Sequence, residues 1–417
     1  MRAALWLLAL FGIAVAVALF AGNNQGSVTL FWPPYRLDLS LNLVLLLLVG
    51  AFLFVHAALG ALAALFDLPR QALRWRTQQK ERAMHASLLD ALSHMLAGRY
   101  LRSRRAAEAV LQQETSLTIG GHRPANASQL RAIAHLLAAE SAQALQDRAA
   151  REDHLKQALE QASARDAQET REGALLRAAR WSLEDRDPEA AMQWLKGLPQ
   201  GAARRTIALR TRLRASRQAG QPGEALETAR LLAKHHAFSP VAARSIVRGL
   251  AVDQLNGAYD VAQLQRAWSA LEPAERAMPE VAIHAAQRVV SLRGDPRIAR
   301  EWLLPVWEAQ AGLGDVLRVK LVCALEDGLD SLDGGWLARI EAAQKSNPRD
   351  ANLQYLAGMA CMKRQLWGKA QQLLTQAALG LQDTRLHRNA WRALAELAEQ
   401  RDDGAAAAQA WKRAAGE

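Results

Sequence analysis

Two apolar segments at the amino terminus constrain this chain more than any other feature. They run from Ala3 to Ala21 and from Leu41 to Phe66, and neither contains Asp, Glu, Lys or Arg. A helix needs about 20 apolar residues to cross a hydrocarbon core about 30 Å thick, and in lipid its backbone must satisfy its own hydrogen bonds. Both segments are therefore predicted to be transmembrane helices, which makes residues 1–66 a two-span membrane anchor.

Charge predicts which side of the membrane each part occupies. The connecting segment, residues 22–40, holds one base and one acid, Arg36 and Asp38. The chain after the second segment is rich in bases, and loops rich in Lys and Arg stay in the cytoplasm. These bases are Arg70, Arg74, Arg76, Lys80 and Arg82. We therefore expect both termini to be cytoplasmic and the connecting segment to be external.

A cleaved signal peptide is the alternative for the first segment, because Ala16-Val17-Ala18 resembles a small-residue cleavage site. Only Met1 and Arg2 precede the apolar run, and a second apolar segment follows at once. Both facts favour a membrane span over a signal peptide.

The external segment has the pattern of a short β-hairpin. Apolar and polar or small residues alternate over 26–32 and again over 36–40, which is typical of strands. Pro33-Pro34 lies between the two runs and predicts a turn, since proline fixes φ and restricts the residue before it. We expect Trp32 and Tyr35 to lie at the depth of the lipid headgroups.

The remainder of the chain is predicted to be helical throughout. Alanine, leucine, arginine, glutamine and glutamate dominate it, and the residues that favour strands are sparse. Cys323 and Cys361 show no CxxC spacing, so neither a disulfide framework nor a zinc site is expected. The net charge of +11 is spread along the helices, which argues against nucleic-acid binding. The bases beside the second span fit anionic lipid headgroups, at about 1 kcal/mol each.

Internal repeats predict an α-solenoid of tetratricopeptide-like helix pairs. The clearest unit has large residues at Trp391 and Trp411 and small ones at Ala395 and Ala407, so that its two helices can approach closely. The unit before it has small residues at matching places, namely Gly358, Ala370 and Ala377.

Weaker units precede these two, around Ala138 and Ala158, around Trp181 and Trp194, and around Leu213 and Ala229. Repeats cannot be assigned from the sequence between 240 and 345. We predict a basic juxtamembrane helix and a first helical hairpin over 67–130, followed by a repeat domain over 131–417.

The tryptophans of these units are either ligand-stacking residues or fillers of the helix-pair core, and packing favours the second role. Several arginines, namely Arg204, Arg205, Arg210, Arg212 and Arg214, form either a solvated helix face or a surface for an acidic partner.

No catalytic or metal-binding motif stands out. The sequence has no glycine-rich phosphate loop, HExxH or GxSxG. His235 and His236 point in different directions if they lie on a helix. His85 and His94 could ligate a porphyrin iron, although a surface or structural role is favoured for both. We expect a protein that is not an enzyme and needs no cofactor, with haem binding as an alternative.

One stretch resembles a known family. The residues Gly22-Asn23-Asn24-Gln25-Gly26, followed by Trp32-Pro33-Pro34-Tyr35-Arg36, lie between two spans and precede helical repeats. This is similar to the HemY family of proteobacterial inner-membrane proteins, which is distinct from the protoporphyrinogen oxidase that shares the name. The match covers about residues 1–130.

The resemblance implies an inner-membrane scaffold that gathers late enzymes of haem biosynthesis, and it supplies no catalytic residues. Two alternatives use the same architecture. One is an assembly or chaperone-like factor for envelope proteins, and the other is a porphyrin carrier.

Overall fold

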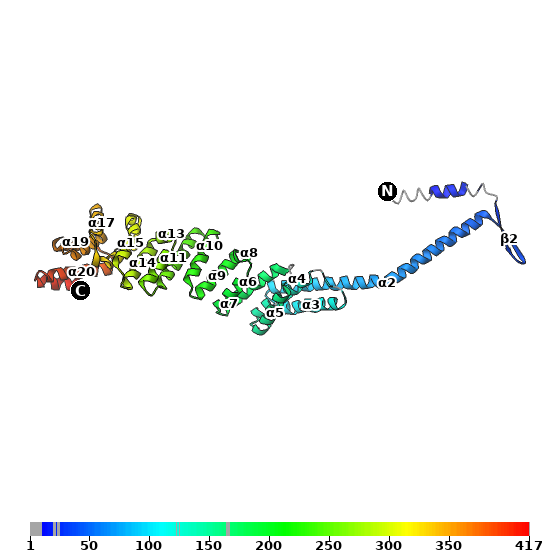
Figure 1. The fold of residues 1–417 in the computed structure, drawn as a ribbon, viewed down its shortest axis with the longest axis horizontal. Helices are drawn as coiled ribbons and strands as arrows, with labels where there is room; N and C mark the ends of the chain where they lie inside the picture. Colours follow the sequence, from blue (N-terminus) through cyan, green and yellow to red (C-terminus); the bar gives the residue numbers. More distant parts are fainter. Residues whose placement is uncertain are drawn as a thin grey trace. The chain divides into compact units, whose positions relative to one another are not determined.

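The computed structural model describes residues 11–19, 22, 26–121, 123–124, 126–163 and 167–416. Helices form nearly all of its regular structure, together with one pair of strands, which confirms the predicted helical fold with a small β-hairpin (Figure 1). The chain divides into two compact units, residues 1–166 and 167–417. The boundaries predicted at 66 and 130 fall within the first unit and stay predictions.

The hairpin consists of β1 (Ser27–Trp32) and β2 (Tyr35–Ser40), which pair antiparallel. Pro33 and Pro34 form the turn, and the peptide bond between them is cis. The Ser40 hydroxyl caps the next helix by accepting from the Leu43 amide at 3.3 Å. The Leu41 amide donates to the Gly26 carbonyl at 2.8 Å, so both ends of the hairpin meet the start of that helix.

This helix, α2 (Leu41–Leu96), contains the one segment of the described chain that is long and apolar enough to cross a membrane, Leu41–Leu62. Two such spans were predicted. The first, Ala3–Ala21, is described as helix only over residues 11–19, which is too short to span, and the rest of it lies outside the described residues. The second was expected to end at Phe66; the candidate span ends at Leu62, and α2 continues as the predicted juxtamembrane helix.

Three more helices complete the first unit, namely α3 (Tyr100–Ile119), α4 (Ala127–Ala144) and α5 (Arg148–Gln161). The carboxy-terminal part of α2 packs against α3, and α3 packs against α4. Their shared core includes Met84, Val110, Leu117, Leu130 and Ala134.

The second unit is a succession of helices in which most pack on the next helix along the chain, whereas α16 packs mainly on α14 and α18. They are α6 (Gln168–Glu184), α7 (Pro188–Lys196), α8 (Gln200–Ala203), α9 (Thr206–Gln218), α10 (Pro222–Lys234), α11 (Pro240–Asn256), α12 (Val261–Ser269), α13 (Pro273–Arg276), α14 (Pro279–Ser291), α15 (Pro296–Glu308), α16 (Asp315–Glu326), α17 (Gly334–Ser346), α18 (Ala351–Lys363), α19 (Trp367–Gly380), α20 (Thr384–Glu399) and α21 (Gly404–Ala415). Two short 3₁₀ helices, η2 (Gln310–Gly312) and η3 (Leu329–Ser331), precede α16 and α17.

Within the described residues, a single type of turn recurs between eight pairs of consecutive helices, α2/α3, α4/α5, α6/α7, α9/α10, α10/α11, α14/α15, α18/α19 and α20/α21. In each turn one residue adopts a left-handed conformation, and the next amide bonds to a carbonyl five residues earlier, as in a Schellman motif. The left-handed residues are Gly98, Gln146, Arg186, Gly220, His236, Arg293, Gln365 and Asp402. The pair α14/α15 lies in the stretch whose repeats the sequence left unassigned.

Aspartate caps reinforce several of these turns. The carboxylates of Asp147, Asp187 and Asp403 each accept from the backbone amide three residues later, at 2.9–3.1 Å. Such caps satisfy amides that the first helical turn leaves unpaired, at about 1 kcal/mol each. The turns between the helices therefore repeat along the chain, as the packed helix faces do.

Candidate functional site

The anchor motif is only partly covered by the described residues. Gly22 is helical and exposed, whereas Asn23 lies outside the described residues. Trp32 and Tyr35 pair across the strands next to the turn and are 72% and 71% exposed. The Arg36 guanidinium lies 5.3 Å from the centroid of the Phe31 ring.

The hairpin presents one apolar face. Residues directly opposite each other in an antiparallel pair lie on the same side of the sheet. The partners Val28 and Leu39, Leu30 and Leu37, and Trp32 and Tyr35 therefore form one face, which we name the apolar hairpin face. The other face carries Ser27 and Ser40, Thr29 and Asp38, and Phe31 and Arg36. Alternation in the sequence predicted two strands, but the register shows that their apolar sides coincide.

The small residues of the penultimate repeat lie at a close helix crossing. A Cβ atom on Gly358 of α18 would come within 2.7 Å of the Leu374 side chain of α19. Ala370 and Ala377, also on α19, are completely buried. Glycine and alanine at these positions allow α18 and α19 to pack closely.

In the last repeat the small residues are more deeply buried than the large ones. Ala395 and Ala407 are buried, at 0% and 4% exposure, whereas Trp411 is 38% exposed and donates to a Glu399 carboxylate oxygen at 2.8 Å. Trp391 is half-buried, with the Arg413 guanidinium 4.5 Å from its ring centroid. Upstream, Trp181, Trp268, Trp307 and Trp336 are all buried.

Two histidines of the first unit lie close together without forming a metal centre. The Nδ1 atoms of His135 and His154 are 3.1 Å apart, and the ring centroids are 5.4 Å apart. The distance between the centroids exceeds the distance between the nitrogens by about two ring radii. The two nitrogens therefore face each other along a hydrogen bond instead of converging on an ion. Burial, followed by the charge of the neighbouring imidazole, lowers the pKa of His135 to about 4. No group of three or more metal-ligating side chains was found in the described part of the chain.

The other histidines named in the sequence do not come together either. His85 and His94 are nine positions apart on α2, which places them on opposite sides of the helix. They cannot ligate one porphyrin from the same side. His235 and His236 lie at the end of α10, where His236 is left-handed and both are exposed.

A buried polar network joins three helices near the carboxy terminus. A Glu326 carboxylate oxygen at the end of α16 accepts from the Tyr355 hydroxyl of α18 at 2.5 Å and from the Asn389 amide of α20 at 3.1 Å. Burial raises the pKa of Glu326, and the two hydrogen bonds oppose that shift. This network could not be predicted from the sequence, because its members are far apart along the chain.

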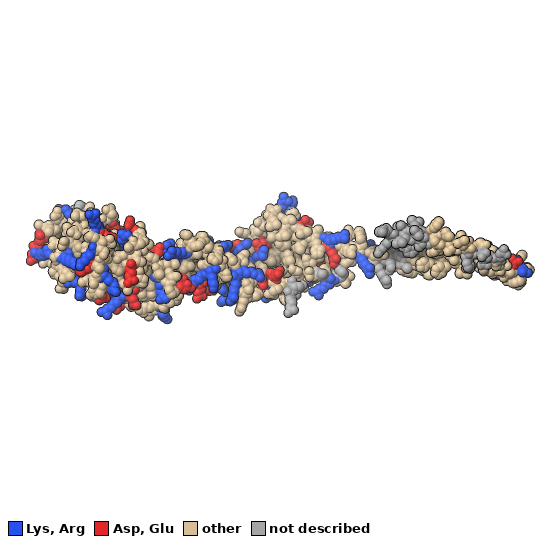
Figure 2. Space-filling model, turned by 90° about the horizontal axis from the view of Figure 1, so that it is seen from above, with Lys and Arg blue, Asp and Glu red and all other residues tan. Residues whose placement is uncertain are grey.

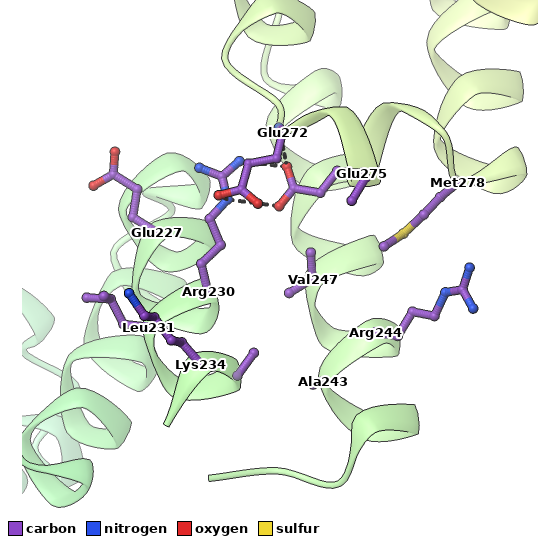
Figure 3. Close-up of a pocket in the computed structure, with 12 residues that line it drawn as sticks. Glu227, Arg230, Leu231, Lys234, Ala243, Arg244, Val247, Glu272, Glu275 and Met278 are labelled. Carbon is purple, nitrogen blue, oxygen red and sulfur yellow. Dashed lines mark hydrogen bonds and ion pairs between the residues drawn. The ribbon is translucent and has the colours of Figure 1, made fainter. Parts of the chain in front are cut away.

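A pocket of about 680 Å³ lies between α10, α11 and α13 (Figure 3). Arg230 closes one end by donating to both carboxylate oxygens of Glu275, at 2.8 and 2.6 Å. Glu275 is 2% exposed, so this ion pair serves mainly to hold α10 against α13. Lys234 and Arg244 also line the pocket, together with apolar side chains such as Met278.

A second groove, of about 550 Å³, has a different charge. Arg210, Arg214 and Arg217 line it from one face of α9, and its apolar side chains include Phe238 and Ile246. We name it the arginine groove. None of its lining residues is Asp or Glu. Arg210 donates to the Ala237 carbonyl at 2.9 Å and lies over the Phe238 ring.

The other arginines suspected from the sequence do not line this groove. Arg205 pairs with Glu172 at 2.9 Å, and Arg212 lies 3.7 Å from Glu224. Arg204 is exposed after α8. Arg217 was not singled out from the sequence, although its spacing of three from Arg214 places both on one face of the helix.

Basic and acidic side chains are interspersed over the helical part of the chain, on the face that Figure 2 shows. No broad basic band covers that face. The arginine groove is a local cluster of three arginines. This distribution suits a limited acidic segment better than a long polyanion.

Three solved structures align with the chain at low similarity. "Crystal structure of APC/C hetero-tetramer Cut9-Hcn1" has 13% identity and a TM-score of 0.28, covering 84% of this chain and 68% of that one. "Structure of Naa15/Naa10 bound to HypK-THB" has 13% identity and a TM-score of 0.22, covering 77% and 57%. "Crystal Structure of P58(IPK) TPR Domain at 2.5 A" has 12% identity and a TM-score of 0.23, covering 76% and 99%.

No curated protein sequence matches the chain. Residues 26–146, however, match the family described as "HemY protein N-terminus". The matched range contains the hairpin, α2, α3 and α4. It also includes most of the motif on which the resemblance was based. The predicted resemblance to the HemY family is therefore supported over residues 26–146.

Proposed function

We propose that the protein is an inner-membrane scaffold whose helical repeats bind protein partners in haem biosynthesis, in particular late enzymes of the pathway. The match to the HemY amino-terminal domain supports the link to haem, and the succession of helix pairs supports protein binding. The scaffold carries out no catalysis of its own and needs no cofactor.

The anchor consists of two spans with both termini in the cytoplasm. The apolar segment Leu41–Leu62 supports the second span, and the bases that follow it support a cytoplasmic position for the repeats. The first span is proposed from the sequence of Ala3–Ala21. Cytoplasmic repeats held at the membrane would meet enzymes at its inner surface.

The arginine groove is the observation that carries the proposal of partner binding. Arg214 and Arg217 are exposed beside apolar side chains, and no carboxylate lines the groove. A guanidinium can bind a carboxylate through two parallel hydrogen bonds, which gives geometric selectivity. We propose that an acidic segment of the partner, with apolar residues between its carboxylates, occupies this groove.

The test uses the full-length protein in detergent and purified late-pathway enzymes as candidate partners. The variant Arg214→Glu/Arg217→Glu should lower affinity by about tenfold or more, because like charges would then face each other. Raising salt from about 0.1 M to about 1 M should also weaken binding, since the Debye length falls from about 10 Å to about 3 Å.

Arg388→Glu/Arg392→Glu is the matched control, because it makes the same charge change on two exposed arginines of α20. Equal loss of binding in both variants would point to overall charge and would refute the groove. Absence of binding to every late enzyme would refute the haem-pathway scaffold itself.

The porphyrin-carrier alternative has less support, because His85 and His94 lie on opposite sides of α2. Haemin titrated into the protein should leave the Soret band unshifted. The assembly-factor alternative would use the same groove for envelope proteins, and the binding assay with late enzymes separates it from the scaffold.

A further inference from the structure

We infer that the apolar hairpin face lies on the membrane, in the interface between headgroups and hydrocarbon. The hairpin then rests flat on the bilayer, next to the helix that enters it. This inference depends on the proposal that α2 spans the membrane. It adds a second, peripheral contact with lipid that the span alone does not supply.

The side chains of the apolar hairpin face are exposed. Leu30, Trp32, Tyr35 and Leu37 are 50%, 72%, 71% and 54% exposed, although all four belong to one face of the sheet. A two-stranded hairpin has no interior in which to bury such a face. An apolar surface of this kind marks a site of contact with a partner or a membrane.

The opposite face of the hairpin is mostly polar. Two of its three cross-strand pairs are polar, and Thr29 lies opposite Asp38. The third pair is Phe31 and Arg36, in which the guanidinium lies 5.3 Å from the ring centroid, although the Phe31 side chain remains 71% exposed. Arg36 also lies 3.5 Å from Asp38. One face of the hairpin is therefore wholly apolar, and the other is polar except for Phe31.

The hairpin lies next to the start of the apolar segment of α2. The Ser40 hydroxyl caps α2, and the apolar segment begins at the next residue, Leu41. The backbone bond from Leu41 to Gly26 holds the start of β1 at the same place. The hairpin thus lies at the level where the helix enters the hydrocarbon, and a membrane is the one apolar phase that must be present there.

Backbone chemistry sets the depth. The outer edges of a two-stranded sheet carry N–H and C=O groups without sheet partners, and such groups cannot enter hydrocarbon without a large penalty. At the interface they can bond to water and headgroups. Trp32 and Tyr35 favour the same depth, because tryptophan and tyrosine concentrate at membrane interfaces.

The experiment measures the environment of spin labels on the full-length protein in phosphatidylcholine–phosphatidylglycerol vesicles. Cys323 and Cys361 are buried and are replaced by alanine. Single cysteines are then introduced as Leu30→Cys and Leu37→Cys on the apolar face and as Thr29→Cys and Asp38→Cys on the other. Collision of each label with oxygen, which partitions into lipid, is compared with collision with a water-soluble nickel chelate.

We expect the ratio of oxygen to nickel collisions to be several-fold higher at positions 30 and 37 than at positions 29 and 38. Equal, water-like ratios at all four would overturn the inference. So would labels at 30 and 37 that neither reagent reaches, because that result means contact with protein.

A fifth label, at Leu47→Cys in α2, separates this result from the anchor proposal. Leu47 is 58% exposed in the apolar segment, and it should collide with oxygen but not with nickel. If the Leu47 label is in lipid while the hairpin labels are in water, the hairpin inference fails and the span stands. A Leu47 label in water would refute both.

Discussion

The amino-terminal segment and the repeats use apolar side chains in opposite ways. In α2, Leu48 and Phe52 are 65% and 67% exposed, whereas Leu264 and Leu303 of the second unit are completely buried. Both regions are helical, so secondary structure does not explain the difference. The difference fits the lipid surroundings proposed for α2 and the packed protein core of the repeats.

The two regions also differ in where their small residues lie. Gly50 and Gly60 of α2 have no neighbouring atoms where a Cβ would stand, but Gly358 of α18 faces Leu374. In the repeats, small residues are required by close packing. An arginine placed in each region should therefore fail for different reasons and in different assays.

The largest expected effect concerns the membrane segment. Phe52→Arg exchanges an apolar residue for a charge near the middle of Leu41–Leu62, which should disfavour insertion by about 3–4 kcal/mol. We expect the variant to be released from membranes by an alkaline carbonate wash that leaves the wild type in place. Val316→Arg, at a residue of α16 that is 71% exposed, should stay in the membrane fraction.

A similar or smaller effect is expected in the last repeat, where Ala407 is 4% exposed. Ala407→Arg should lower the free energy of unfolding by about 2–4 kcal/mol, because it adds bulk and an unpaired charge to a packed contact. Urea unfolding in detergent, followed by far-ultraviolet circular dichroism, measures this. Ala408→Arg, on the exposed side of the same helix, should change stability by about 0.5 kcal/mol or less.

These two substitutions test the comparison together. Ala407→Arg should leave the protein in the membrane, and Phe52→Arg should leave the repeats folded. A variant that fails both assays would mean that anchor and repeats are not independent in stability.

The smallest effect is a dependence on pH in the first unit. The pKa of His135 is lowered from 6.5 to about 4, so between these values the unfolded chain binds more protons than the folded one. Stability should be complete above about pH 6.5 and should fall as the pH drops toward 4, by about 1 kcal/mol for this half-exposed pair. Urea midpoints at about pH 5 and pH 7 should differ less in His135→Gln/His154→Gln; an unchanged difference would assign the effect to other groups.

Much of the fold could be predicted from local patterns. The alternation around Pro33-Pro34 predicted the hairpin, and Asp187-Pro188 predicted the break between α6 and α7, because turn and cap chemistry depends on neighbouring residues. Asp295-Pro296 likewise marks the turn between α14 and α15, with Asp295 as the cap and Pro296 as the first residue of α15, but the two helices could not be assigned to a repeat from the sequence. A geometry that several residue types can adopt leaves a weak trace in sequence.

The grooves were harder to predict than the helices. Arg210 and Arg214 were suspected along with three other arginines, and nothing local distinguished those that pair with acids from those that stay exposed. Arg205 is neutralised by Glu172, which lies on a different helix, and the Glu326 network likewise joins residues from three helices. Such pairings depend on tertiary packing, which periodicity in a single sequence does not encode.

Helix α2 joins the membrane segment to the first helical hairpin without an intervening loop, and α3 packs along its far end. If the apolar part of α2 spans the membrane, a change in its tilt would therefore also move α3. Pro69 lies within this helix, shortly after the apolar segment. Proline lacks the amide that bonds within a helix, and it is a common cause of helix kinks. When a change in bilayer thickness alters the tilt of the span, bending of α2 at Pro69 would reduce the resulting movement of α3.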